Sequence, residues 1–198
     1  MAEDNSVEST IQALRESEAK VQGPVVAGAV KFLSETEAME NPRIDLHLTD
    51  VAKREAAEDL YVRQMAALRE LTGERDASLI PLLIPYIHYT DDFSFRNDWK
   101  PRPQTTPNPK PDLKAWAFHW PAFAVIAMTP GSGPILAKYI LNPKNPDRYK
   151  MHAFEILGTM YPGVHEAEVS GPAAKEALLE RIENGEVKER PSVNSGGK

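Results

Sequence analysis

Cysteine is absent from this chain of 198 residues. Its absence excludes disulfide bonds, thiolate nucleophiles and thiolate metal ligands, although it does not distinguish one cellular compartment from another. Long apolar runs are missing as well, since no stretch reaches the roughly 18 residues that a membrane-spanning helix needs. The first residues, Met1–Asn5, are acidic and no apolar segment follows them. We therefore expect a cytoplasmic protein without a secretory signal or a membrane partner.

The sequence motifs of the common enzyme classes are lacking too. The chain contains no GxSxG motif, no Walker-type phosphate loop, no dinucleotide-binding glycine pattern and no HExxH motif. The glycines within residues 130–134 have a proline at each end, which is typical of a turn between helices. We expect a protein that is not an enzyme and binds no cofactor.

What the chain does contain is a soluble globular composition with segregated charge. Hydrophobic residues make up 41% and charged residues 26% of the sequence. The net charge of -6 is divided unevenly, with -9 in residues 1–98, +6 in residues 99–150 and -3 in residues 151–198. The basic middle could meet an anionic partner or pair with the chain's own acidic residues, and we favour the second interpretation.

Apolar residues recur at helical spacing, and proline-containing steps separate the segments. The first expected helix covers residues 5–20, with Val7, Ile11 and Leu14 on one face. Further helices are expected over residues 24–39, 51–71, 78–87, 115–128, 132–141, 148–161 and 173–184.

Two of the expected helix ends have a stated cause. Thr49 or Asp50 is expected to cap the helix of residues 51–71, and Gly73 is placed to end it in a left-handed conformation. A short acidic link without regular structure is expected between Gly163 and Ser170.

Residues 88–114 have no helical periodicity and read as a long insertion loop. Prolines occur there at positions 101, 103, 107, 109 and 111, close to Phe93, Phe95 and Trp99. Loops of this length are uncommon inside compact domains and usually have a function. The domain organisation predicted is one helical domain over residues 1–187 that contains this loop, followed by a disordered tail over residues 188–198.

An internal repeat emerges when the helical segments are superimposed. Residues 81–87 match residues 134–140, and Gly-Pro steps start helices at Pro24, Pro134 and Pro172. The repeated unit is a helix, a glycine-containing turn and a helix that a proline opens. The equivalent prolines, at positions 24, 81, 134 and 172, are 57, 53 and 38 residues apart, and the last spacing is close to the roughly 40 residues of two-helix solenoid repeats.

In this pattern the chain resembles HEAT or armadillo-like helical repeats, chiefly over residues 66–87, 122–141 and 153–182. It departs from that family in its irregular spacing, in its proline-rich insertion and in lacking a regular Asp and Arg ladder. The resemblance implies an all-α fold, a short α–α superhelix that binds other proteins, with no catalytic residues to transfer.

We expect a protein-binding adaptor or scaffold whose partner is another protein, with an acidic segment as its favoured chemistry. The oligomeric state is left open. The expected partner-binding residues combine the aromatic and basic side chains of the insertion with the basic turn near residue 146. They are Phe93, Phe95, Trp99, Lys100, Arg102, Lys144 and Arg148.

Two other functions remain as alternatives. His88 with Asp91 and Asp92, joined by His119 across the insertion, could form a histidine–carboxylate metal site of a hydrolase, although no metal-binding spacing supports it. The basic side chains of residues 99–150 could bind an anion or a nucleic acid. Eight basic residues there, on an otherwise acidic chain, make nucleic acid the less favoured partner.

Overall fold

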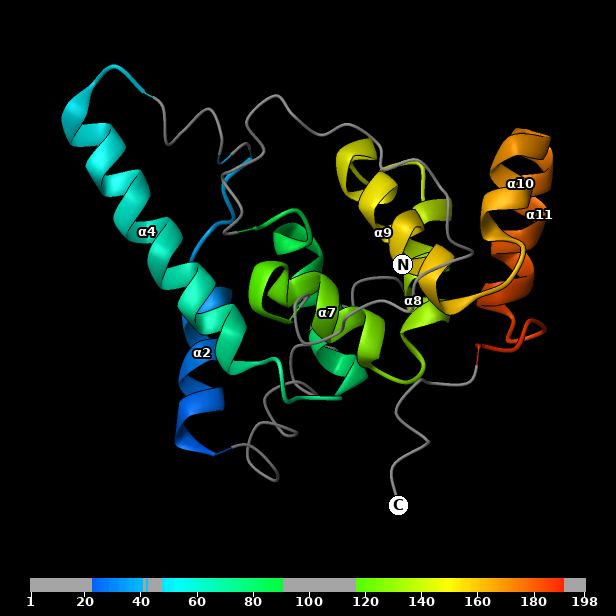
Figure 1. Ribbon diagram of the computed structural model, residues 1–198, viewed down its shortest axis with the longest axis horizontal. Coiled ribbons are helices and arrows are strands. Elements are labelled where there is room, and N and C mark those ends of the chain that lie inside the picture. The colour runs from blue at the N-terminus through cyan, green and yellow to red at the C-terminus, as the bar shows by residue number, and fades with distance from the viewer. Residues whose placement is uncertain (1–22, 41, 43–47, 91–116, 191–198) are drawn as a thin grey trace, which may run out of the picture.

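The computed structural model describes residues 23–40, 42, 48–90 and 117–190 (Figure 1). All regular structure within these ranges is helical, which confirms the all-α prediction. The helix predicted over residues 5–20 lies outside them, and so do most of the predicted insertion and residues 191–198 of the predicted tail.

The described α-helices differ in length from one turn to more than five turns. They are α2 (Pro24–Glu35), α4 (Val51–Glu70), α5 (Ile80–Leu83), α7 (Pro121–Met128), α8 (Ser132–Leu141), α9 (Asp147–Met160), α10 (Val164–Ser170) and α11 (Pro172–Glu183). Two 3₁₀ helices, η1 (Ala77–Leu79) and η2 (Ile84–Tyr86), flank α5. The predicted bounds of α8 are correct, and those of α9 and α11 are correct to within one residue at each end.

The long helix α4 begins as predicted and ends differently. The Asp50 carboxylate caps it by accepting a hydrogen bond of 3.2 Å from the Lys53 amide. The backbone of Leu71, the C-cap, is still right-handed, and Gly73 is not among the glycines with positive φ. The prediction of a left-handed cap at Gly73 is therefore wrong, because a turn of ordinary geometry follows the helix.

Proline explains two irregular helices in the middle of the chain. The helix predicted over residues 78–87 is present from Ala77, but Pro81 and Pro85 each remove an amide donor, and it alternates between 3₁₀ and α geometry. The helix predicted over residues 115–128 is interrupted at Trp120, whose ψ of 68° is not helical. Pro121, the next residue, disfavours helical backbone at Trp120 and opens α7 instead.

Helix α10 occupies the acidic link that was predicted to lack regular structure. Gly163 and Gly171 bracket it with left-handed φ angles of 82° and 108°. Val164 is its one buried residue and Val169 is 89% exposed, so the helix has no apolar stripe that the sequence could reveal. The prediction of an irregular link is wrong for this reason. Gly185, with φ of 72°, follows α11 as predicted.

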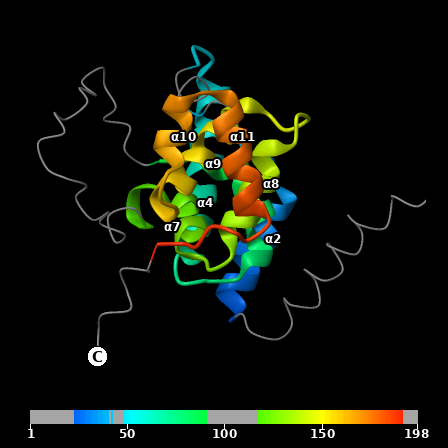
Figure 2. The same ribbon diagram turned by 90° about the vertical axis from the view of Figure 1, so that its right-hand side faces the viewer.

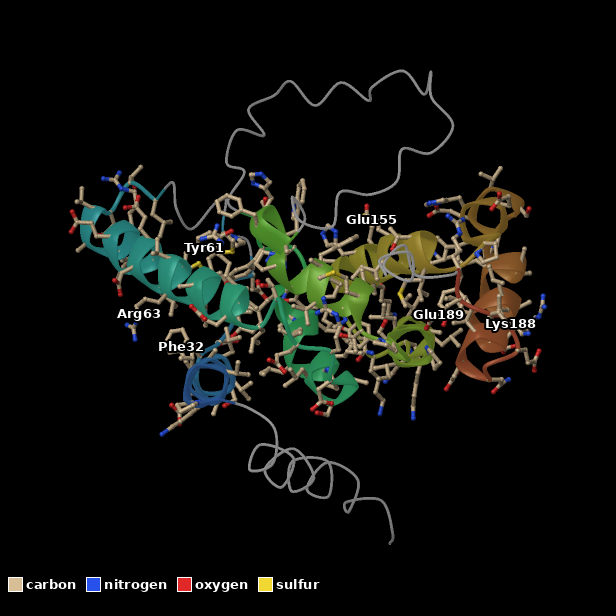
Figure 3. The ribbon with its side chains drawn as sticks, turned by 60° about the horizontal axis from the view of Figure 1, so that its bottom comes forward. Phe32, Tyr61, Arg63, Glu155, Lys188 and Glu189 are labelled. Atoms are coloured by element: carbon tan, nitrogen blue, oxygen red, sulfur yellow. The ribbon has the colours of Figure 1, made fainter. Side chains whose placement is uncertain are left out.

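The helices form two rows along the long axis of the molecule (Figures 1 and 3). The first row contains α4, α7, α9 and α10, and each of these contacts the next. The second row contains α2, the segment 77–86, α8 and α11. The rows are joined by contacts of α2 with α4, α8 with α9, and α10 with α11. In the end-on view, α8 and α11 lie on one side and α7 and α10 on the other (Figure 2).

A single cluster of buried apolar side chains runs from Ala29 in α2 to Ile182 in α11. It joins the two rows along their whole length. No single helix of the described part is long and apolar enough to cross a bilayer, and α7 and α8, which reach that length together, meet at an angle of 115°.

Two buried glycines test how tightly the second half is packed. A Cβ atom at Gly133 would overlap the ring of Tyr161, which is buried, whereas one at Gly158 would approach only the imidazole of the exposed His165. We expect Gly133→Ala to lower the free energy of unfolding by about 1–3 kcal/mol through overpacking. Gly158→Ala should change it by less than about 1 kcal/mol, because the imidazole can move and alanine favours helix. Urea denaturation of both variants measures the difference, and equal losses would contradict this packing.

Candidate partner-binding site

Helix α4 holds both boundaries of residues 91–116. At one boundary the Tyr61 hydroxyl donates to the Thr90 carbonyl at 2.6 Å and accepts from the Thr90 amide at 3.0 Å. At the other, Arg69 Nε donates to the Phe118 carbonyl at 3.3 Å, and its guanidinium lies 4.8 Å from the centre of the Phe118 ring. Tyr61 and Arg69 are eight positions apart on one helix, which corresponds to about 12 Å along its axis.

Most of the predicted site residues belong to the segment between these boundaries and lie outside the described residues. This holds for the predicted partner-binding residues Phe93, Phe95, Trp99, Lys100 and Arg102, and for the metal candidates Asp91 and Asp92. Their roles stay predictions. The structure does place Lys144, Arg148 and His88.

Arg148 is engaged with the acidic first half of the chain. Its guanidinium lies 3.1 Å from the Glu40 carboxylate and 4.6 Å from the centre of the Tyr149 ring. The hydrogen bond to Glu40 raises the pKa of Arg148 further above its ordinary value. Lys150 is 3.4 Å from Asp147 in the same turn of α9. Part of the basic middle is thus neutralised by the chain itself, as the favoured interpretation of its charge predicted.

Lys144 is an exposed side chain on a turn that hydrogen bonds hold in place. The Lys144 amide donates to Asn142 Oδ1 at 3.0 Å, and Asn145 Nδ2 donates to the Tyr139 carbonyl at 2.8 Å. The turn therefore presents one cation to solvent a few residues before the Arg148–Glu40 pair. Such a surface can attract an acidic segment, although exposed pairs of this kind each contribute little energy.

His88 is half-buried and has one satisfied nitrogen. Its Nε2 lies 3.1 Å from the Met39 carbonyl, which can only accept, whereas its Nδ1 is buried without a partner. The ring lies 5.7 Å from that of Tyr149 and 6.4 Å from that of His152. Burial lowers the pKa of His88 to about 4, and the neighbouring charges of His152 and Arg148 act in the same direction. His88 is therefore neutral at pH 7.

The described part of the chain contains no group of three histidine or acidic side chains that could hold a metal ion. His88 lies beside His152, whose Nδ1 is 3.1 Å from Glu155 Oε2, whereas His119 contacts the rings of Phe118 and Trp120. The predicted metal site depends on Asp91 and Asp92 and stays a prediction.

A network of tyrosines next to His88 was not predicted from the sequence. The rings of Tyr61 and Tyr89 stack 4.8 Å apart, and the ring of Tyr86 meets Tyr89 edge-on at 5.2 Å. The Tyr89 hydroxyl donates to Gln64 Oε1 at 2.8 Å and accepts from the Met39 amide at 2.7 Å. A signal was available in Gln64, a polar residue between the apolar positions of α4.

Comparisons of the chain with protein-family models, with curated proteins and with solved structures find no match. The contacts of these residues are therefore the basis for any functional proposal.

The Tyr61 hydroxyl should be what fixes the chain at Thr90. Tyr61→Phe removes both hydrogen bonds and keeps the stacked ring, so we expect faster hydrogen exchange at the Thr90 amide and a loss of about 1–2 kcal/mol of stability. Tyr139→Phe is the matched control, because the Tyr139 hydroxyl has no hydrogen bond within the described residues. Unchanged exchange at Thr90 would show that the boundary is held in another way.

The lowered pKa of His88 makes folding dependent on pH. Between about pH 6.5 and pH 4 the unfolded chain binds a proton at His88 that the folded protein does not, so stability falls as pH falls through this range. From pH 7 to about pH 5.5 we expect a loss of about 1 kcal/mol from this group. Urea midpoints at both pH values should show a smaller decrease in His88→Phe than in the wild type. His165→Phe, at an exposed histidine, should behave like the wild type, and equal decreases in all three would refute the assignment.

Proposed function

We propose that this chain is a non-enzymatic scaffold of helical pairs, similar to HEAT and armadillo repeats, that binds another protein through residues 91–111 and the adjoining basic turn. The observation that carries the proposal is the shared anchoring of residues 91–116. Both boundaries of a segment rich in proline, aromatic and basic residues are held by α4, by Tyr61 at one and by Arg69 at the other.

The order of the helices supports the repeat part of the proposal. Pro24, Pro81, Pro134 and Pro172, which the sequence comparison aligned, all lie in helices of the second row. A helix of the first row precedes three of these helices directly, as α4, α7 and α10. Helix α9 is an addition to the pattern, because it follows α8 and lies between α7 and α10 in the first row. Stacked pairs of this kind give extended surfaces suited to protein binding.

The chemistry of the surface supports a protein partner with acidic character. Lys144 is exposed, and Arg148 is held by a single exposed carboxylate, Glu40, whose side chain is 79% exposed. An acidic partner can replace that carboxylate at little cost, because surface pairs are weak. Aromatic and arginine side chains such as Trp99 and Arg102 are the types that dominate binding energy at protein interfaces.

Deletion of residues 91–111 tests the proposal directly. The deletion leaves residues 112–116 between Thr90 and Ala117, and these six Cα steps span up to about 20 Å. We expect the deletion to keep the helical circular dichroism signal and to abolish capture of a partner from a native lysate. Trp99→Ala with Arg102→Ala, in the full-length chain, should weaken the same capture at least tenfold.

Two outcomes would overturn the proposal. One is loss of the helical signal on deletion, which would make residues 91–111 part of the packed structure. The other is capture of the same proteins by the wild type and the deletion variant.

The Arg148–Glu40 pair provides a second and sharper test. Glu40→Gln frees the guanidinium, so we expect it to raise the affinity for the captured partner a few-fold at low salt, and Arg148→Ala to lower it by a similar factor. Glu35→Gln is the matched control, since it makes the same charge change in a different surface pair, Lys31–Glu35. Equal effects of the two glutamate variants would mean that net charge alone matters and that Arg148 is not a contact residue.

A further inference from the structure

An open apolar groove lies between α2 and α4. These two helices are at one end of the molecule (Figure 1). It has a volume of about 300 Å³. Its walls are formed by Val25, Gly28, Ala29 and Phe32 of α2 and by Arg63, Ala66, Ala67 and Glu70 of α4. A Cβ atom placed on Gly28 would meet nothing within 4 Å, so the groove has room beside α2.

The side chains of the groove suit a helix as its occupant. Gly28, Ala66 and Ala67 are small and allow another backbone to approach closely, as at tightly packed helix pairs. Phe32 extends from α2 toward α4, where the Arg63 guanidinium covers its ring at 4.9 Å (Figure 3). The groove is thus apolar along its floor and carries charges of both signs at its rim, with Glu70 in its lining as well as Arg63, which also lies 3.5 Å from Asp59.

The chain itself contains a segment that matches the groove in length and polarity. Val7, Ile11 and Leu14 line one face of the helix predicted over residues 5–20 and span seven positions, about 10.5 Å. The groove residues span the same seven positions on each wall, from Val25 to Phe32 and from Arg63 to Glu70. Glu8 flanks the apolar face and can approach the Arg63 cation.

Connectivity and helix order point to the same occupant. Gly23-Pro24 leads directly into α2 beside Val25, so the preceding helix joins α2 through a short turn, as in antiparallel helical hairpins. In the repeated unit of the sequence, each proline-opened helix of the second row follows a helix of the first row. The helix before α2 would therefore lie next to α4 in the first row, at the groove.

We propose that residues 5–20 form a helix that packs into the groove between α2 and α4 through Val7, Ile11 and Leu14. This helix covers the apolar end of the stack, in the way that capping repeats close helical-repeat proteins. The inference rests in part on the helix order of the proposed function, and it leaves residues 91–116 as the surface for partners.

Because the chain has no cysteine, single thiols can report on the groove. Ala66→Cys places a thiol inside it, and Ser34→Cys places one on the exposed side of α2, outside the groove lining. In the full-length protein we expect the thiol at position 66 to react with a maleimide about tenfold more slowly than the thiol at position 34, because reaction requires local opening.

Substitutions in the segment then identify the occupant. Ile11→Asp, combined with Ala66→Cys, should remove most of the protection, whereas Ser9→Asp, on the opposite face of the predicted helix, should leave it intact. Circular dichroism shows whether each variant is folded. A second measurement needs no change in the segment: a nitroxide attached at position 66 should broaden the amide signals of Val7, Ile11 and Leu14, and a nitroxide attached through Glu176→Cys on α11, at the far end of the molecule, should not.

Three results would overturn the inference. They are equal reactivity of the two thiols, sharp amide signals of residues 7–14 with the nitroxide at position 66, and protection that increases with protein concentration, which would indicate a second copy of the chain in the groove. Loss of protection with partner capture intact refutes this inference alone, whereas loss of capture with protection intact refutes only the proposed function.

Discussion

The structure depends on the buried amide of Gln64. Its side chain is fully buried in α4, yet each of its hydrogen-bonding atoms has a partner: Oε1 accepts from Tyr89, and Nε2 donates to Thr36 and to the Glu37 carbonyl. These partners lie in two segments, residues 36–37 and Tyr89, so Gln64 joins three segments that are distant in the sequence, α4 included. Because an unsatisfied buried amide costs about 1–3 kcal/mol, the three segments can come together in one register only. Gln64 thereby fixes how α4 meets the end of α2 and residues 86–90.

The candidate functional residues lie next to the segments that Gln64 joins. Tyr89, which bonds to Gln64, is followed directly by Thr90, where the Tyr61 hydroxyl holds the boundary of residues 91–116. His88, on the other side of Tyr89, bonds to Met39, and Arg148 bonds to Glu40. Hydrogen bonds thus fix the described residues on which the proposed binding surface would rest, and a surface ordered before binding loses less conformational entropy on binding.

Local signals in the sequence were enough to place most helices, since Gly-Pro steps and apolar spacing act within a few residues. Where these local signals failed to predict a helix or its start, the cause was also local. Pro121 stood inside an apolar run that read as one helix, and α10 had only Val164 to bury. The tyrosine network could not be predicted, because the partners of Gln64 are set by tertiary packing. The same holds for Arg148. The charge pattern predicted a partner among the chain's own acidic residues, but nothing in the sequence identified that partner as Glu40.

The arrangement of the helices in two rows explains how the basic middle of the chain contacts the acidic first half. The basic turn of residues 142–150 leads into α9, the helix that interrupts the alternation of rows between α8 and α10. This added helix is what carries Arg148 to Glu40 and Tyr149 to His88, and so it connects the basic middle with the acidic first half. The placement of α9 is therefore the feature that brings Arg148 and Tyr149 to the other described residues of the candidate site.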